Sequence, residues 1–153
     1  MSVLLIRHAH AGNRSSWRGE DAARPLSERG HLQAQGLIAL LADRTITSLA
    51  SSPALRCAQT IEPLAASLGL DVILDKRLAE GSPLRPALGL VLAGDDTVLC
   101  AHGDLIPDLM ARLMSRGMKA THPERCQKGS VWEIEIDQAK AVRARYLPPA
   151  RPT

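Results

Sequence analysis

The chain has 153 residues, of which 45% are hydrophobic and 23% charged. This size and composition are typical of one globular domain and exclude a full eight-stranded α/β barrel. The net charge of +3 identifies no partner, and the 2% of aromatic residues disfavours a nucleic-acid-binding surface, because such surfaces stack bases on aromatic rings. Only four of the 19 basic residues are Lys. Most positive charge is therefore guanidinium, which binds phosphate with two prongs, although a biased genome composition would give the same pattern.

Cysteine usage and the N-terminal segment indicate the compartment. Cys57, Cys100 and Cys126 are widely spaced and odd in number, which argues against a disulfide framework or a structural zinc site. The first apolar run is too short for the core of a signal peptide or for a membrane span. We therefore expect a cytoplasmic protein that does not associate with membranes.

The first half of the chain alternates predicted strands and helices. The apolar run 3–6 is typical of a strand buried on both faces, and it ends at Arg7-His8. A polar loop follows over residues 9–25, and loops of this length are usually functional. The remaining elements of this half are a helix over 27–41 capped by Ser27, a strand over 47–51, a helix from Ser52-Pro53 to Gly69 with Ser52 as cap, and a strand over 70–74.

The second half continues the alternation and then changes character. We expect a loop over 80–86, a short helix ending at Leu92, a buried strand over 97–101 and a helix over 106–115. Residues 131–136 and 141–146 alternate apolar and polar side chains, which predicts an antiparallel hairpin. The expected fold is a single-domain three-layer α/β/α sandwich over residues 1–147, with a mostly parallel sheet, helices on both faces, this hairpin at the edge, and a flexible tail over 148–153.

Polar side chains follow three of the predicted strands. Arg7 and His8 follow the first, Arg56 lies a few residues beyond the second, and His102 follows the fourth. Ligands of open α/β sheets bind beyond the carboxyl ends of the strands, so these four side chains are expected to share one rim. Two guanidiniums and two imidazoles repel one another unless an anion lies among them. A phosphoryl group suits this set, and inorganic phosphate or sulfate is expected to occupy the same place.

At these residues the sequence resembles the histidine phosphatase superfamily, also called phosphoglycerate mutase-like. Residues 7–9 (Arg-His-Ala) stand where the family has Arg-His-Gly, and residues 52–60 match its Ser-Pro-x-x-Arg-x-x-x-Thr element. His102-Gly103 matches a later His-Gly, and residues 78–81 resemble the acidic loop of the family. The branch with the greatest similarity is that of the small SixA-type phosphohistidine phosphatases and the domains fused behind Nudix hydrolases, on the basis of residues 7–12, 24–26 and Gly30.

The resemblance implies phosphoryl transfer in two steps, without a metal or other cofactor. The imidazole of His8 attacks phosphorus and forms a phosphohistidine, which water then hydrolyses. Arg7, Arg56 and His102 neutralise the phosphoryl oxygens. The implied substrate is a phosphohistidine protein or a small phosphorylated metabolite. Glu80 is the candidate general acid, or alternatively a loop carboxylate paired with Arg77 or Arg85.

The long loop supplies candidate substrate-binding residues, namely Asn13, Arg14 and Arg24. Cofactor-dependent mutases have Asn six residues after the catalytic His, whereas here Asn13 lies five residues after His8 and Arg14 takes the sixth place, which disfavours mutase activity. His10 points to the opposite face if the chain stays extended, so we leave it out of the site.

Two further alternatives remain open from the sequence. His8-Ala9-His10 could be a metal-binding pair, although the rest of a zinc-hydrolase ligand set is missing. The domain could also bind a phosphorylated ligand without turnover.

Overall fold

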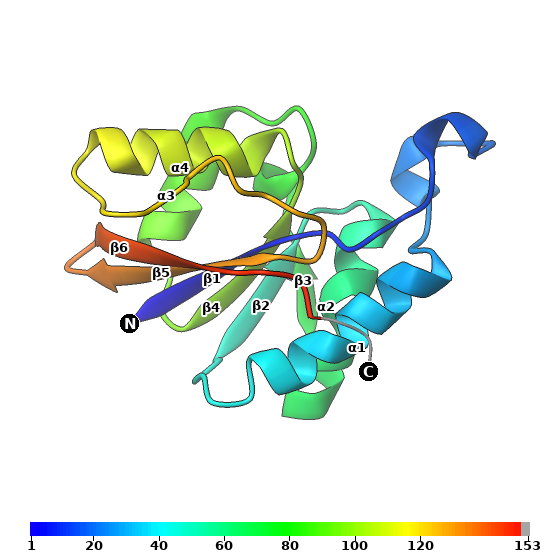
Figure 1. The fold of residues 1–153 in the computed structure, drawn as a ribbon, viewed down its shortest axis with the longest axis horizontal. Helices are drawn as coiled ribbons and strands as arrows, with labels where there is room; N and C mark the ends of the chain where they lie inside the picture. Colours follow the sequence, from blue (N-terminus) through cyan, green and yellow to red (C-terminus); the bar gives the residue numbers. More distant parts are fainter. Residues whose placement is uncertain (151–153) are drawn as a thin grey trace.

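The computed structural model describes residues 1–150, which form one six-stranded mixed sheet between two layers of helices (Figure 1). The strand order is β3-β2-β4-β1-β5-β6. The strands are β1 (Ser2–Arg7), β2 (Ser48–Ser51), β3 (Val72–Leu74), β4 (Thr97–Ala101), β5 (Val131–Asp137) and β6 (Lys140–Leu147). Strands β1 to β4 run parallel to one another. Strand β5 pairs antiparallel with β1 and with β6, so the β5–β6 hairpin forms the edge of the sheet opposite β3. The predicted α/β/α architecture and edge hairpin are confirmed.

Alternation along β1 builds two cores, one on each face of the sheet. Val3 and Leu5 face a cluster that includes the helices α3 (Leu84–Leu92) and α4 (Leu105–Ser115). Leu4 and Ile6 face a second cluster that includes α1 (Glu28–Leu40) and α2 (Leu55–Leu68). A strand with helices on both faces buries side chains on both sides, which is why residues 3–6 are all buried and form an unbroken apolar run.

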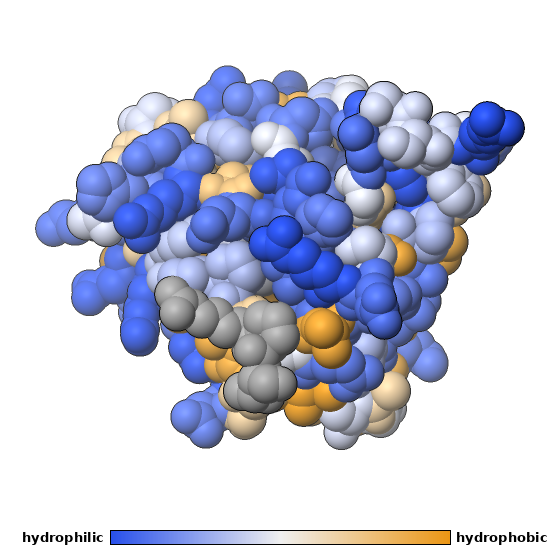
Figure 2. Space-filling model, turned by 45° about the vertical axis from the view of Figure 1, so that its right-hand side comes forward, coloured by the Kyte–Doolittle hydropathy of each residue, from blue (hydrophilic) through white to orange (hydrophobic). Residues whose placement is uncertain are grey.

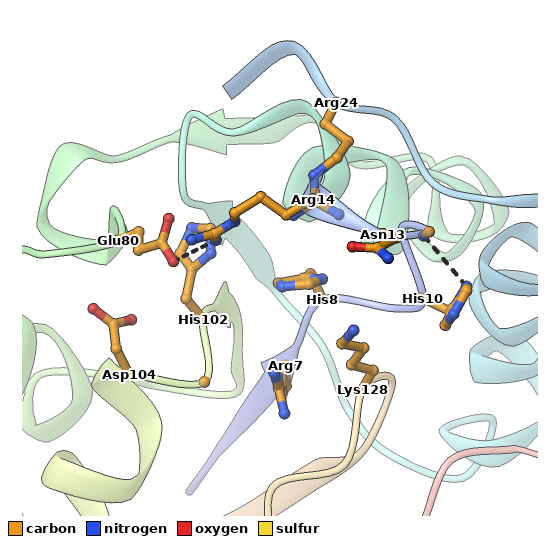
Figure 3. A pocket seen from close by; sticks show the side chains of 12 residues that line it. Arg7, His8, His10, Asn13, Arg14, Arg24, Glu80, His102, Asp104 and Lys128 are labelled. Carbon is orange, nitrogen blue, oxygen red and sulfur yellow. Dashed lines mark hydrogen bonds and ion pairs between the residues drawn. The ribbon is translucent and has the colours of Figure 1, made fainter. Parts of the chain in front are cut away.

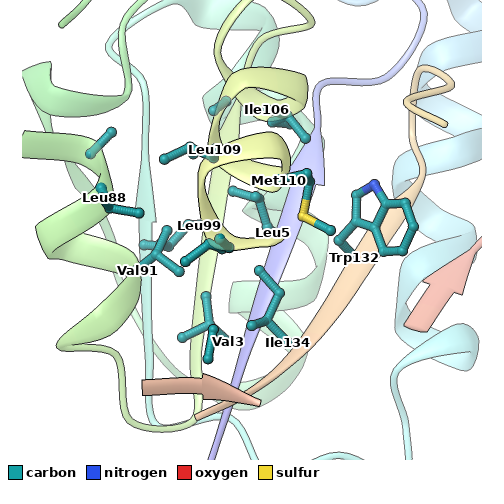
Figure 4. Close-up of a cluster of buried hydrophobic side chains, with 14 of the residues drawn as sticks. Val3, Leu5, Leu88, Val91, Leu99, Ile106, Leu109, Met110, Trp132 and Ile134 are labelled. Carbon is teal, nitrogen blue, oxygen red and sulfur yellow. The ribbon is translucent and has the colours of Figure 1, made fainter. Parts of the chain in front are cut away.

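The α3–α4 face shows how the sheet is covered (Figure 4). Val3, Leu5 and Leu99 of the central strands pack against this layer with Trp132 of β5, and all four are at most 1% exposed. Burying one such side chain contributes about 1.5–3 kcal/mol. These contacts fix the central strands and therefore the position of the residues that follow them.

Two predicted helix starts are wrong by a few residues. Helix α2 begins at Leu55 with Ala54 at its N-cap, and the Ser52 hydroxyl accepts only a 3.3 Å hydrogen bond from the Ala54 amide. Helix α3 begins at Leu84, so Pro86 lies inside its first turn and does not end a loop. A proline is tolerated there because the amides of the first turn have no partner within the helix.

The face drawn in Figure 2 is mainly hydrophilic, and hydrophobic side chains show there only as separate small patches. Among residues 1–150, every helix is too short or too polar to cross a bilayer. Strand β6 ends at Leu147, and Ala150 lies close to Gly36 of α1. The predicted flexibility of the tail stays a prediction, and its last residues, 151–153, lie outside the described residues.

Candidate active site

The carboxyl ends of β1 and β4 open into a cavity of about 620 Å³ (Figure 3). Because these strands are parallel neighbours, with Arg7 paired to Ala101, the residues that follow them lie side by side. The cavity is lined by Arg7, His8, His10, Gly12, Asn13, Arg14, Arg24, Glu80, His102, Gly103, Asp104 and Lys128. Seven of the eight residues expected at the site therefore line one cavity, and the eighth, Arg56, lies beside His102.

His8 is buried and held in one orientation. Its Nδ1 donates a hydrogen bond of 2.8 Å to the carbonyl oxygen of Ala9, which can only accept. The proton of the neutral ring is therefore on Nδ1, and the lone pair is on Nε2. Burial lowers the pKa of His8 to about 3, and the positive charges of Arg56 and Arg7 act in the same direction as burial. A neutral imidazole with a free Nε2 is a nucleophile at neutral pH.

Arg7 extends from the end of β1 with one side of its guanidinium held by the protein. Its Nη1 donates to the carbonyl oxygen of Cys126 at 2.6 Å. Its Nε is buried and has no hydrogen-bond partner among the described residues. Buried donors without partners are rare in folded proteins, so the described residues leave one donor of this guanidinium unsatisfied beside the cavity that Arg7 lines.

His102 and Arg56 form the wall beside His8. The rings of His8 and His102 are 5.4 Å apart between centroids. Nε2 of His102 lies 2.8 Å from the hydroxyl of Ser52, and its Nδ1 lies 3.4 Å from Nη2 of Arg56. Arg56 is 1% exposed, and its Nε is also buried without a partner in residues 1–150. The sequence predicts Ser52 only as a helix cap and does not predict its contact with His102.

Two carboxylates neutralise the arginines on one side of the cavity. Glu80 pairs with Arg14 at 2.7 Å and with Arg56 at 3.4 Å. Asp21, which sequence reasoning did not select, pairs with Arg56 at 3.0 Å and with Arg14 at 3.3 Å. Although burial opposes it, the positive charge of Arg56 and of its neighbours lowers the pKa of Asp21 below its usual value. These carboxylates hold the guanidiniums in place before any substrate arrives.

Asn13 and Arg24 line the cavity but already have partners in the loop. The Asn13 carboxamide oxygen accepts hydrogen bonds from the amide and hydroxyl of Ser15. Arg24 is buried, donates to the carbonyl oxygen of Ala11 at 2.7 Å and pairs with Asp21. Both residues therefore fix the loop that forms one wall, and their predicted contact with substrate stays a prediction.

His10 and Lys128 line the cavity as well, and the expectation that His10 points away from it is wrong. The ladder of β1 ends at Arg7, and the His10 amide donates to the side chain of Gln33, so the alternation of a strand no longer applies. The residue Gly30 permits this path, because a Cβ there would lie 1.9 Å from the carbonyl oxygen of His10. Lys128 comes from the loop before β5, for which the sequence offers no periodic signal.

The donor set at the strand ends is suited to anions. Arginine and lysine side chains donate hydrogen bonds and accept none. Within residues 1–150, no group of three or more His, Cys, Asp and Glu side chains is arranged to hold a metal ion.

Comparisons with known proteins agree with this geometry. A curated relative from Mycolicibacterium smegmatis, described as 8-oxo-(d)GTP phosphatase, is 35% identical over 97% of this chain. The chain spans 48% of that relative, about half its length. Two solved SixA structures share the fold, both with a TM-score of 0.76. The one from Agrobacterium tumefaciens is 23% identical, over 97% of this chain and 98% of that chain. The other, a protein histidine phosphatase complexed with tungstate, is 18% identical, over 99% of this chain and 97% of that chain.

The family assignment rests on the N-terminal half of the chain. The model of the histidine phosphatase superfamily (branch 1) matches residues 3–83, which include His8, Arg56 and Glu80. The chain belongs to the histidine phosphatase superfamily.

Proposed function

We propose that the protein hydrolyses phosphorylated substrates through a covalent phosphohistidine on His8. In the first step, Nε2 of His8 forms a bond to phosphorus while the bond from phosphorus to the leaving group breaks. In the second step, a water oxygen attacks phosphorus, the N–P bond breaks, and inorganic phosphate leaves. The route replaces one difficult displacement with two easier ones.

The observation that carries this proposal is the state of the His8 ring. Its hydrogen bond to Ala9 and its lowered pKa support a neutral ring with the lone pair on Nε2. Nucleophilic attack needs that lone pair, whereas a residue that only bound phosphate would gain from being protonated. The same hydrogen bond stabilises the positive charge that develops on the ring as the N–P bond forms.

The second requirement is that positive groups neutralise the negative charge of the phosphoryl group during its transfer. Arg7 lines the cavity, Arg56 lies beside His102, and His102 lies against His8. Phosphoryl transfer draws most of its acceleration from positioning and from positive groups around the equatorial oxygens. We assign this role to Arg7, Arg56 and His102.

Two substrate classes fit the proposed reaction: a small phosphorylated metabolite or a phosphohistidine protein. A cavity of about 620 Å³ falls in the range of sites for small molecules. The relative described as an 8-oxo-(d)GTP phosphatase supports the inclusion of nucleotides among the metabolites tested.

Rapid-quench labelling tests the proposed intermediate. We expect wild-type protein mixed with a 32P-labelled substrate to carry acid-labile, base-stable label, and His8→Ala to carry none. His31→Ala, on the exposed face of α1, is the matched control and should label normally. Full turnover by His8→Ala would contradict the mechanism.

Hydrolysis of para-nitrophenyl phosphate in EDTA separates the remaining alternatives. The proposed mechanism predicts undiminished turnover. Loss of turnover in EDTA would support the metal-binding pair, and absence of turnover under all conditions would support a binding domain.

A further inference from the structure

Positive charge is distributed unevenly around His8. On the side of Glu80, the cations Arg14 and Arg56 are paired with carboxylates. On the other side, Lys128 forms no ion pair with any carboxylate of residues 1–150. Figure 3 shows the Lys128 side chain extending toward His8, with Glu80 and Asp104 on the opposite side of that ring. An ammonium without a partner in a half-enclosed cavity is a site for an anion.

The backbone at Lys128 is attached to the strand end that carries the nucleophile. The amide of the next residue, Gly129, donates to the carbonyl oxygens of both Arg7 and His8, at 3.0 and 3.1 Å. The carbonyl oxygen of Lys128 accepts a hydrogen bond of 3.3 Å from the buried side chain of Gln33. The ammonium therefore extends from a fixed point beside the nucleophile, which is the preorganisation that a binding site requires.

Other cations near Lys128 also favour the binding of an anion beside it. Burial lowers the pKa of Lys128, and the positive charges of Arg7, Arg24, Arg14 and Arg29 lower it further. The pKa of the adjacent His10 is lowered in the same way, by burial and then by Lys128. A bound anion would relieve this repulsion between cations.

The cavity is also larger than one phosphoryl group requires. Its volume of about 620 Å³ corresponds to about twenty water molecules at the density of the liquid. The proposed function assigns Arg7, Arg56 and His102 to the one phosphoryl group next to His8. The space beside Lys128 and His10 remains for the part of the substrate that departs.

We propose that Lys128 binds the second phosphoryl group of a substrate whose terminal phosphoryl group is transferred to His8, so that the preferred substrates are diphosphates or polyphosphates. The inference rests on the proposed function, because it takes the group beside His8 to be the one transferred. As the N–P bond forms, the bond from phosphorus to the bridging oxygen breaks, and its electron pair stays on the departing phosphate. The ammonium of Lys128 neutralises that charge. Lysine suits this task because it acts as a point charge toward phosphate from any direction.

Binding to a variant that cannot turn over tests the subsite separately from the chemistry. We would measure the affinity of full-length His8→Ala for inorganic pyrophosphate and for inorganic phosphate by calorimetry, at fixed pH and ionic strength. The same measurement is made after adding Lys128→Ala or, as the control, Lys140→Ala. Lys140 lies on β6 opposite Asp137, beyond the amino end of β1 and remote from the cavity.

We expect the parent variant to bind pyrophosphate at least about 10-fold more tightly than phosphate. Adding Lys128→Ala should weaken pyrophosphate binding by about 10- to 100-fold, the range of a hydrogen bond between charged groups, and weaken phosphate binding by less than about 3-fold. Lys140→Ala should change neither. Equal losses for the two anions, or no preference for pyrophosphate in the parent, would overturn the proposal. Absence of acid-labile label on wild-type His8 would instead refute the proposed function and leave the binding result as it stands.

Discussion

The guanidinium of Arg7 lies directly against the Cα of Gly103, so that a Cβ at this position would lie 2.6 Å from Cζ of Arg7 and 2.8 Å from its Nε. Carbon atoms in contact normally lie about 3.5–4.0 Å apart. The glycine that follows His102 therefore provides the space in which Arg7 reaches the cavity. This contact gives a physical reason for a glycine after the second histidine.

We predict that Gly103→Ala impairs catalysis far more than folding. The obstructing group is the end of a flexible side chain, so the new methyl group should displace the Arg7 guanidinium while the backbone stays in place. A misplacement of about 1 Å can reduce turnover by about 100-fold, and we expect kcat/KM to fall by about 10- to 100-fold. The melting temperature should change little.

Gly89→Ala is the matched control for this substitution. A Cβ at Gly89, on the exposed side of α3, meets nothing within 4 Å. Alanine there should leave activity unchanged and stabilise the helix by about 0.5–1 kcal/mol. Wild-type activity in Gly103→Ala would show that the position of Arg7 does not matter to the reaction.

Arg56→Lys should be damaging although it conserves the charge. The Arg56 guanidinium contacts two groups of Asp21, the backbone carbonyl oxygen at 2.9 Å and the carboxylate at 3.0 Å. It also lies 3.4 Å from Nδ1 of His102. An ammonium cannot reach all of these atoms and an anion as well. We expect kcat/KM to fall by about 10²–10³-fold, the cost of losing one positioned donor. Arg85→Lys serves as the control, because Arg85 is an exposed residue of α3.

A crystal grown in sulfate or tungstate provides the structural check on this wall. The anion should contact Arg7, Arg56 and His102 together. An anion bound elsewhere in the cavity, with these three side chains ordered, would contradict the assignment of the transferred group to this position.

The sequence predicts the part of the site that strands position. β1 and β4 are buried on both faces, so their unbroken apolar runs are visible in the sequence, and parallel pairing then brings His8 and His102 to one edge. Arg56 follows by the same rule, through its position on the helix after β2. These placements depend on hydrogen-bonded ladders, whose geometry is regular.

The parts contributed by loops were not predictable from the sequence. Asp21 and Lys128 lie in segments without periodicity, and their positions depend on single contacts such as the Gly129 amide with the Arg7 carbonyl oxygen. His10 was placed wrongly because the strand pattern was extended three residues beyond the last residue of β1. No spacing rule gives the path of a chain after its ladder ends.

The lowered pKa of His8 predicts how stability depends on pH. An unfolded histidine has a pKa of about 6.5, whereas folding lowers the pKa of His8 to about 3. Between these values the unfolded chain binds a proton that the folded protein does not, so acid destabilises the fold through this residue. Above about pH 6.5 both states are neutral, and the contribution vanishes. The slope within the window is on the order of 1 kcal/mol per pH unit.

Urea unfolding at several pH values between about 7 and 4.5 measures this linkage. The free energy of unfolding should fall more steeply with acid in wild-type protein than in His8→Ala. All other groups titrate in both proteins, so the difference isolates His8. The buffer must lack phosphate and sulfate, because a bound anion would favour the protonated ring. Parallel curves for the two proteins would show that His8 has an ordinary pKa.

The role of Glu80 depends on the leaving group. Both of its oxygens face guanidiniums, Oε1 that of Arg14 and Oε2 that of Arg56, so acting as an acid requires a substrate to displace at least one of these contacts. An alcohol leaving group has a pKa of roughly 15.7, near that of water, and must receive a proton as it departs. An imidazole, with a pKa of about 6.5, and a phosphate, with a pKa of about 6, need little help.

We therefore predict that Glu80→Gln separates substrates by their leaving groups. If Glu80 is the general acid, hydrolysis of alkyl phosphates should slow by about 10²–10⁴-fold, while aryl phosphates, phosphohistidine and pyrophosphate should change little. All substrates are compared at one pH on one preparation, with Glu62→Gln on the exposed face of α2 as the control. Equal losses on every substrate would assign Glu80 to holding Arg14 and Arg56 in place. No loss on any substrate would mean that another group, or water, protonates the alcohol.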